Sequence, residues 1–238
     1  MHSELHHHTH IDPHSNASAL ADVILGGQDG LVNVLGVILG VAAATGDPRI
    51  VMAAGLAATF AESVSMGAVA YTATLAESDF YMSELEREYR HVQEVPTLEQ
   101  QEIRDIYRRR GFEGELLDRI VDTITANKDV WVAVMMAEEH QLTPTDRQTA
   151  LRRALVVGVA AVIGSLIPLA PFAFLPVKVS MGVSILVSAL TLFAVGVYKA
   201  RATVGRPGKS GLEMALIGTL SAMVGYGVGL LFKAPALP

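Results

Sequence analysis

Residues 21–44 read ADVILGGQDGLVNVLGVILGVAAA, a mostly apolar stretch with one carboxylate, Asp29, about a helical turn from its middle. A helix rises about 1.5 Å per residue, so this stretch can cross the roughly 30 Å hydrocarbon core of a bilayer. A carboxylate at that depth costs at least about 2.5 kcal/mol, and such groups usually face a water-filled cavity or an ion path. The stretch therefore predicts a membrane span with a functional polar face.

The small and polar residues of this stretch recur near the 3.6-residue period, which places them on one helical face. They are Asp22, Gly26, Asp29, Asn33, Gly36 and Gly40. The other faces carry Val, Leu and Ile, as in a helix with a pathway on one side and lipid on the other. The alternative is that Asp29 is buried and hydrogen-bonded, and only holds helices together.

The composition of the whole chain agrees with a membrane protein. It is 51% hydrophobic and 18% charged, whereas soluble domains carry about 25% charged residues. Five apolar runs are long enough to span a bilayer, at roughly 20–45, 49–77, 151–176, 177–199 and 211–233. The prediction is an all-α polytopic protein with five transmembrane helices. The net charge of −6 gives no hint of nucleic-acid binding, and the lack of cysteine excludes thiolate sites.

The second span holds Glu62 and Met66, which lie one turn apart and share a face with small residues. This arrangement leaves room for an ion or for a close neighbouring helix. A methionine alone is more simply explained as core filling, but Met66 stands beside a carboxylate within the membrane. We therefore expect Asp29, Asn33, Glu62 and Met66 to line a transport path.

The second helix should continue out of the membrane as a stalk, because residues 68–95 contain no Gly or Pro. Three short helices follow the stalk's end at Pro96. The first is expected to open with a capping box over Thr97–Gln100 and to stop at Gly111. Residues 78–150 hold 16 acidic against 9 basic side chains, so this insert is acidic.

Carboxylates, a histidine and two methionines recur at helix-neighbour spacing in the insert. The candidate metal ligands are Glu84, Glu88, His91, Glu99, Glu102, Met135, Met136 and Glu139. Such a donor set suits a borderline first-row divalent ion better than Mg²⁺ or Ca²⁺. The alternative for any one pair is a solvated acidic face. A di-iron oxidase would need Glu-x-x-His twice, and the motif occurs once, at Glu88 and His91.

The N-terminal residues 1–18 contain six of the eight histidines: His2, His6, His7, His8, His10 and His14. An expression tag is one explanation. The interrupted spacing favours a native tail that collects metal.

Orientation follows from Lys and Arg in the short connections. The 199–209 loop has four, and three more flank the start of the third span on the insert side. We expect the N-terminus and the insert in the cytosol, the C-terminus outside, and the cell (inner) membrane as the location.

Four segments together resemble the vacuolar iron transporter family. They are GGQDGLVNVLGVILGVAAA, AGLAATFAESVSMGAVAY, SDFYMSELERE and WVAVMMAEEHQL, in the family's order. The resemblance implies a five-span homodimer with a cytosolic three-helix metal-binding insert between spans two and three. It also implies export of Fe²⁺, often Mn²⁺ too, in exchange for protons.

By resemblance, Asp29 and Met66 match the ion-path positions, and six insert residues match the metal ligands: Glu88, Glu99, Glu102, Met135, Met136 and Glu139. Two positions depart from the pattern. Ala58 stands where family members carry a path glutamate, and Glu62, one turn on, is a candidate substitute. His91 replaces a stalk glutamate, which would soften the site toward metals other than iron.

The expected organisation is a His-rich tail (1–18), spans one and two (19–77), the metal-binding insert (78–146) and spans three to five (147–234). The expected function is a non-enzymatic divalent-metal transporter of Fe²⁺ and Mn²⁺, with protons as the exchanged ion and no prosthetic group. The alternatives are a membrane-tethered metal sensor or buffer, and a membrane-bound ferroxidase.

Overall fold

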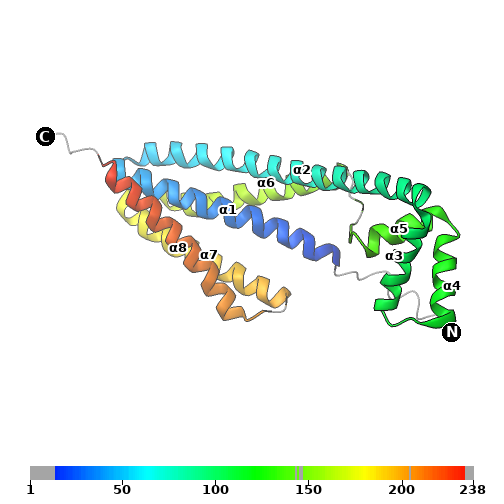
Figure 1. Ribbon diagram of the computed structural model, residues 1–238. Helices are drawn as coiled ribbons and strands as arrows, with labels where there is room; N and C mark the ends of the chain where they lie inside the picture. The colour runs from blue at the N-terminus through cyan, green and yellow to red at the C-terminus, as the bar shows by residue number, and fades with distance from the viewer. Residues whose placement is uncertain (1–13, 143, 145–146, 204, 234–238) are drawn as a thin grey trace, which may run out of the picture. The chain divides into compact units, whose positions relative to one another are not determined.

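The computed structural model describes residues 14–142, 144, 147–203 and 205–233, so most of the His-rich tail lies outside the described residues (Figure 1). Within them every regular element is a helix, as the sequence predicted. The elements are α1 (His14–Thr45), α2 (Pro48–Glu94), α3 (Pro96–Arg109), α4 (Gly114–Thr125), α5 (Lys128–Glu138), α6 (Arg147–Leu169), η1 (Ala170–Ala173), α7 (Val177–Ala202) and α8 (Pro207–Leu231).

Five helical segments of the described chain are long and apolar enough to cross a membrane. They are Ala19–Thr45, Pro48–Glu94, Arg147–Ala173, Val177–Ala202 and Pro207–Leu231. This confirms the five predicted spans. The chain divides into two compact units, one made of the residues up to Tyr71 and from Leu151 onwards, the other of Thr72–Ala150. We describe each unit by itself.

In the first unit, glycines bring helix backbones into direct contact. A Cβ placed on Gly225 or Gly229 of α8 would stand 2.2 or 2.0 Å from the carbonyl oxygen of Gly36 or Gly40 of α1. Only glycine lets two helices approach so closely, so the Gly-x-x-x-Gly pair of α8 is the contact surface for α1 (Figure 1).

The same pattern joins α1 to α6. A Cβ on Gly26 of α1 would stand 2.1 Å from the carbonyl oxygen of Val157 of α6, and a Cβ on Gly164 of α6 would stand 2.1 Å from that of Gly27. At the start of α1, the buried Asp22 accepts hydrogen bonds from the Arg153 side chain of α6 at 3.3 Å. The small and polar residues of α1, which the sequence places on one face, thus have two different partners. Gly26 contacts α6, whereas Gly36 and Gly40 contact α8.

In the second unit, the outer part of α2 packs with α3, α4 and α5 around one apolar core. Its buried members are Val92, Ile103, Leu117, Val121, Ile124, Trp131, Val132, Met135 and Met136. The short helices present these side chains at i, i+3 and i+4 spacing, which gives each one an apolar stripe. The core holds the three helices against the stalk and so fixes the polar groups at its edge.

The N-terminal ends of α3 and α5 are capped in different ways. The predicted capping box is wrong, because α3 begins at Pro96 with Val95 as N-cap and no side-chain cap hydrogen bond. Proline at the first helical position lacks an N–H that would have had no partner there, so the helix starts before Thr97. At the start of α5, the Asn127 side chain accepts from the backbone N–H of Asp129 and Val130.

Candidate metal path and metal-binding insert

Two groups of polar side chains have the composition of metal sites, one in each unit. The span cluster consists of Asp29, Asn33, Glu62 and Met66. The insert cluster consists of Glu88, His91, Glu99, Glu102, Glu139 and His140. The six insert residues are all carboxylates or histidines, and each group draws on more than one helix.

The span cluster joins α1 to α2. The Asn33 side-chain amide donates a hydrogen bond to Glu62, and the Asp29 and Glu62 carboxyl groups are near enough to interact directly. Asp29 and Asn33 are exposed on the single chain, whereas Glu62 and Met66 are half-buried. Met66 follows Glu62 by one turn of α2. The structure therefore brings three of the four predicted path residues together, with Met66 next along the same helix.

Ala58, one turn before Glu62, has apolar surroundings. It packs against the core cluster formed by Val34, Ile38 and their neighbours. The carboxylate that α2 offers to Asp29 is Glu62. That Glu62 substitutes for a glutamate at position 58 stays a prediction.

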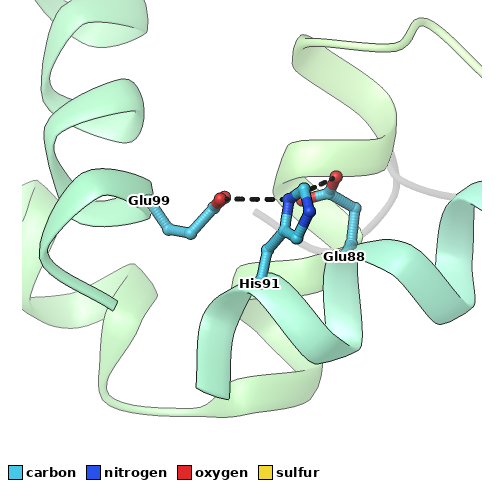
Figure 2. A group of neighbouring side chains, drawn as sticks. All are labelled: Glu88, His91 and Glu99. Atoms are coloured by element: carbon cyan, nitrogen blue, oxygen red, sulfur yellow. Dashed lines mark ion pairs between the residues drawn. The ribbon is translucent and has the colours of Figure 1, made fainter. Parts of the chain in front are cut away.

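In the insert cluster, His91 lies between two buried carboxylates (Figure 2). Its Nδ1 atom is 3.4 Å from Oε1 of Glu99 on α3 and 4.0 Å from Oε1 of Glu88, one turn earlier on α2. Glu88 is 3% exposed and Glu99 is 2% exposed. The three residues could offer ligand atoms within 4.8 Å of one another, which is close enough for one metal ion.

A second group of three shares Glu88. It joins Glu88 with Glu139 and His140, which follow the last turn of α5, and its ligand atoms also lie within 4.8 Å of one another. Nε2 of His140 is 3.0 Å from Oε1 of Glu88. The sequence does not predict His140 as a ligand, because Glu138-Glu139-His140 lacks the Glu-x-x-His spacing and the turn that brings it back to α2 leaves no periodic signal.

Burial and mutual repulsion favour the protonated forms of two carboxyls in this cluster. Burial, and then the charges of Glu102 and Glu88, raise the pKa of Glu99 to about 7. Burial also raises the pKa of Glu102, with the charges of Glu139 and Glu88 adding to the effect. Perturbed carboxyls gathered at one place are typical of functional sites.

The buried oxygens Oε2 of Glu88 and Oε2 of Glu99 have no hydrogen-bond partner among the described residues. A buried polar atom without a partner costs about 1–3 kcal/mol, so an arrangement that keeps two of them needs a reason. A divalent cation would satisfy both oxygens and would offset the repulsion between the carboxylates.

The remaining predicted ligands lie elsewhere in the insert. Glu84 is buried one turn before Glu88 and forms an ion pair with Arg87. Met135 and Met136 are 0% and 2% exposed and belong to the apolar core. Their assignment as metal ligands stays a prediction.

Comparison with known proteins covers nearly the whole chain. The family model described as the VIT family matches residues 20–230. Vacuolar iron transporter 1 of Tulipa gesneriana is 34% identical over 219 residues, which is 91% of this chain and 89% of the relative. Vacuolar iron transporter 1 of Oryza sativa subsp. japonica is 34% identical over 93% of this chain and 89% of its own length. The vacuolar iron transporter of Plasmodium berghei (strain Anka) is 28% identical over 97% of this chain and 90% of its own length.

Proposed function

This chain belongs to the VIT family, and on that premise we propose that it transports divalent transition-metal ions, Fe²⁺ and also Mn²⁺, out of the cytosol in exchange for protons. The multi-pass membrane location follows from the five apolar helices and the family. The named relatives are iron transporters, which supports metal as the cargo. Transport of Mn²⁺, the direction of transport out of the cytosol and the exchange for protons go beyond what the relatives' names say.

The observation that carries the proposal is the pairing of two carboxylates on two membrane-length helices. Asp29 of α1 and Glu62 of α2 interact directly, and Asn33 donates a hydrogen bond to Glu62. Two carboxylates inside a bilayer are costly unless they handle a cation. An anchor helix would gain nothing from them, which argues against a tethered sensor.

Proton exchange follows from the chemistry of these carboxylates. A carboxylate binds a metal ion only in its deprotonated form, so metal binding releases a proton and protonation expels the metal. A pair that alternates between a proton and a metal ion, and opens to one side at a time, couples the two fluxes in opposite directions.

The insert is proposed to collect the ion on the cytosolic side. Its buried carboxylates and imidazoles suit borderline divalent ions. The basic residues that flank the third span and fill the 199–209 loop support a cytosolic insert and an outside C-terminus.

The proposed assembly is a homodimer. Asp29 and Asn33 are exposed on the single chain although they lie in a membrane-length helix. Lipid cannot solvate these groups, so they need a protein or aqueous neighbour. A second copy over this face would give the path a second wall, and the particle mass in detergent, 25.3 kDa or twice that, distinguishes monomer from dimer.

The test is metal flux into liposomes that contain a metal-sensitive dye and a pH dye. Fe²⁺ under reducing conditions and Mn²⁺ are each added outside, with protein-free liposomes as the control. The expected result is metal entry accompanied by proton exit. Metal that binds the protein without reaching the lumen would instead indicate a membrane-tethered sensor.

A further inference from the structure

His140 is held close to the most buried part of the insert cluster by the end of α5. Gln141 adopts a left-handed backbone with φ of 55°, and the Leu142 N–H donates to the Met136 carbonyl, so the chain turns back directly after His140. The imidazole is 17% exposed and lies against Glu88, which belongs to α2. The turn therefore presents this ring to the stalk.

Two imidazoles from separate elements thus lie near the same carboxylate oxygen, and only that of His140 is within hydrogen-bond distance of it. Oε1 of Glu88 is 3.0 Å from Nε2 of His140 and 4.0 Å from Nδ1 of His91. Ligand atoms that share a metal at about 2.1 Å lie roughly 3.0–3.4 Å from one another. The His140–Glu88 contact is already in this range, whereas His91 belongs to the other group of possible ligands that shares Glu88, so its ring must turn toward His140 before one ion can bind both imidazoles. His91 and His140 are also the only two histidines outside the N-terminal tail.

A second observation points to a cation at this place. Oε2 of Glu88 and Oε2 of Glu99 are both buried without a hydrogen-bond partner in the described chain, and both side chains are more than nine-tenths buried. Water solvates an exposed carboxylate, whereas these two buried oxygens accept no hydrogen bond from any described residue. The two neighbouring groups of possible ligands meet at Glu88.

We propose that His140 is a metal ligand, and that with His91 and Glu88 it forms a two-imidazole site that makes the insert favour late first-row divalent ions over Mn²⁺. This inference rests on the proposed role of the insert in collecting metal, and it specifies which metals the insert prefers. Imidazole nitrogen suits Zn²⁺, Ni²⁺ and Co²⁺, whereas carboxylate alone suits Mn²⁺ and Mg²⁺. Two nitrogens at one site therefore increase the preference for Co²⁺ over Mn²⁺.

The experiment uses the full-length protein in detergent with the six tail histidines changed to Gln, so that His91 and His140 are the only histidines left. Co²⁺ and Mn²⁺ affinities are measured by titration for this parent and for His140→Gln and His140→Glu. Loss of even an outer-shell partner lowers metal affinity about 10- to 100-fold, so Co²⁺ affinity should fall about tenfold or more in His140→Gln. Mn²⁺ affinity should change less, and least in His140→Glu.

A spectroscopic count separates a ligand from a hydrogen-bond partner. With one equivalent of Cu²⁺, pulsed EPR detects the remote nitrogen of each bound imidazole. We expect two imidazoles in the parent and one in either His140 variant. Emission from Trp131, the only tryptophan and a member of the same core, verifies that each variant is folded.

An unchanged imidazole count and an unchanged ratio of Co²⁺ to Mn²⁺ affinity in a folded variant would overturn the proposal and leave His140 as a hydrogen-bond partner of Glu88. The result is independent of transport. A protein that binds metal through two imidazoles but moves none in liposomes would refute the proposed function and leave this site standing.

Discussion

At the scale of single residues, Glu99 is the group through which we expect pH to act on the insert. Its pKa is raised to about 7 from the ordinary 4.5, chiefly by burial. Below about pH 7 the neutral form is therefore favoured in the metal-free fold. Glu99 contributes stability that is fully present below pH 4.5 and is lost as the pH rises through about 7. Metal binding has the opposite dependence, because it requires the carboxylate.

We therefore predict that the affinity of the insert for Mn²⁺ falls about tenfold per unit as the pH drops below 7, since one proton must leave. In Glu99→Gln the affinity should be lower at pH 8 and its pH dependence shallower. Titrations from pH 6 to 8 measure both effects, with the exposed Glu115→Gln as the matched control. A Glu99→Gln protein with the parent's full slope would show that other groups carry the dependence.

Glu62 is the second residue whose role can be tested by itself. A contact between a charged group and its partner is worth about 1.5–3 kcal/mol, so Glu62→Gln should slow metal flux about ten- to hundredfold. The double change Ala58→Glu with Glu62→Ala moves the carboxylate back by one turn of α2. Because Asn33 donates its hydrogen bond to the carboxylate at position 62, we expect metal flux to stay low in this variant. Flux restored by this double change would mean that either position can serve.

At the scale of elements, the glycines of α8 set how closely it packs on α1. Gly229→Ala places a methyl group 2.0 Å from the Gly40 carbonyl oxygen, so the helices must separate. Overpacking of this kind costs about 1–3 kcal/mol, and the protein should lose its folded elution peak at a lower temperature on heating in detergent. Gly227→Ala, two residues earlier, has open space and is the control. Equal melting of the two variants would contradict this packing.

The sequence predicts elements better than it predicts their partners. The absence of Gly and Pro from residues 68–95 predicts the long α2, and five apolar runs predict the spans, because both depend on local composition. Periodicity on α1 places Asp22, Asp29 and the glycines on one face. It does not reveal that Asp22 pairs with Arg153 or that the glycines divide between α6 and α8, since tertiary packing decides those contacts.

The insert cluster shows the same limit. Spacing along α2 brings Glu88 and His91 together, and the structure adds Glu99 from α3. His140 enters through a turn with a left-handed residue at Gln141, for which the sequence offers no glycine as a signal. The thioether sulfur of Met135 and Met136 predicts that they are metal ligands. The structure shows that both side chains also fill the apolar core.

At the scale of the whole molecule, one chain carries both the insert that we propose collects metal and the carboxylate pair of the five spans. The two compact units share the helix α2, which carries Glu62 in one and Glu88 in the other. The span cluster and the insert cluster therefore each contain a residue of the same continuous helix. The proposed function requires that the ion pass Asp29 and Glu62 on its way through the membrane.

The most direct test compares wild type, Asp29→Asn and Glu213→Gln in liposomes with metal and pH dyes inside. Glu213 is an exposed carboxylate of α8 that pairs with Lys209, so its change controls for charge alone. We predict that Asp29→Asn abolishes Fe²⁺ and Mn²⁺ entry together with the linked pH change, while Glu213→Gln transports like wild type and the insert of both variants still binds metal. Metal-coupled proton flux that continues undiminished in Asp29→Asn would contradict the proposed transport path.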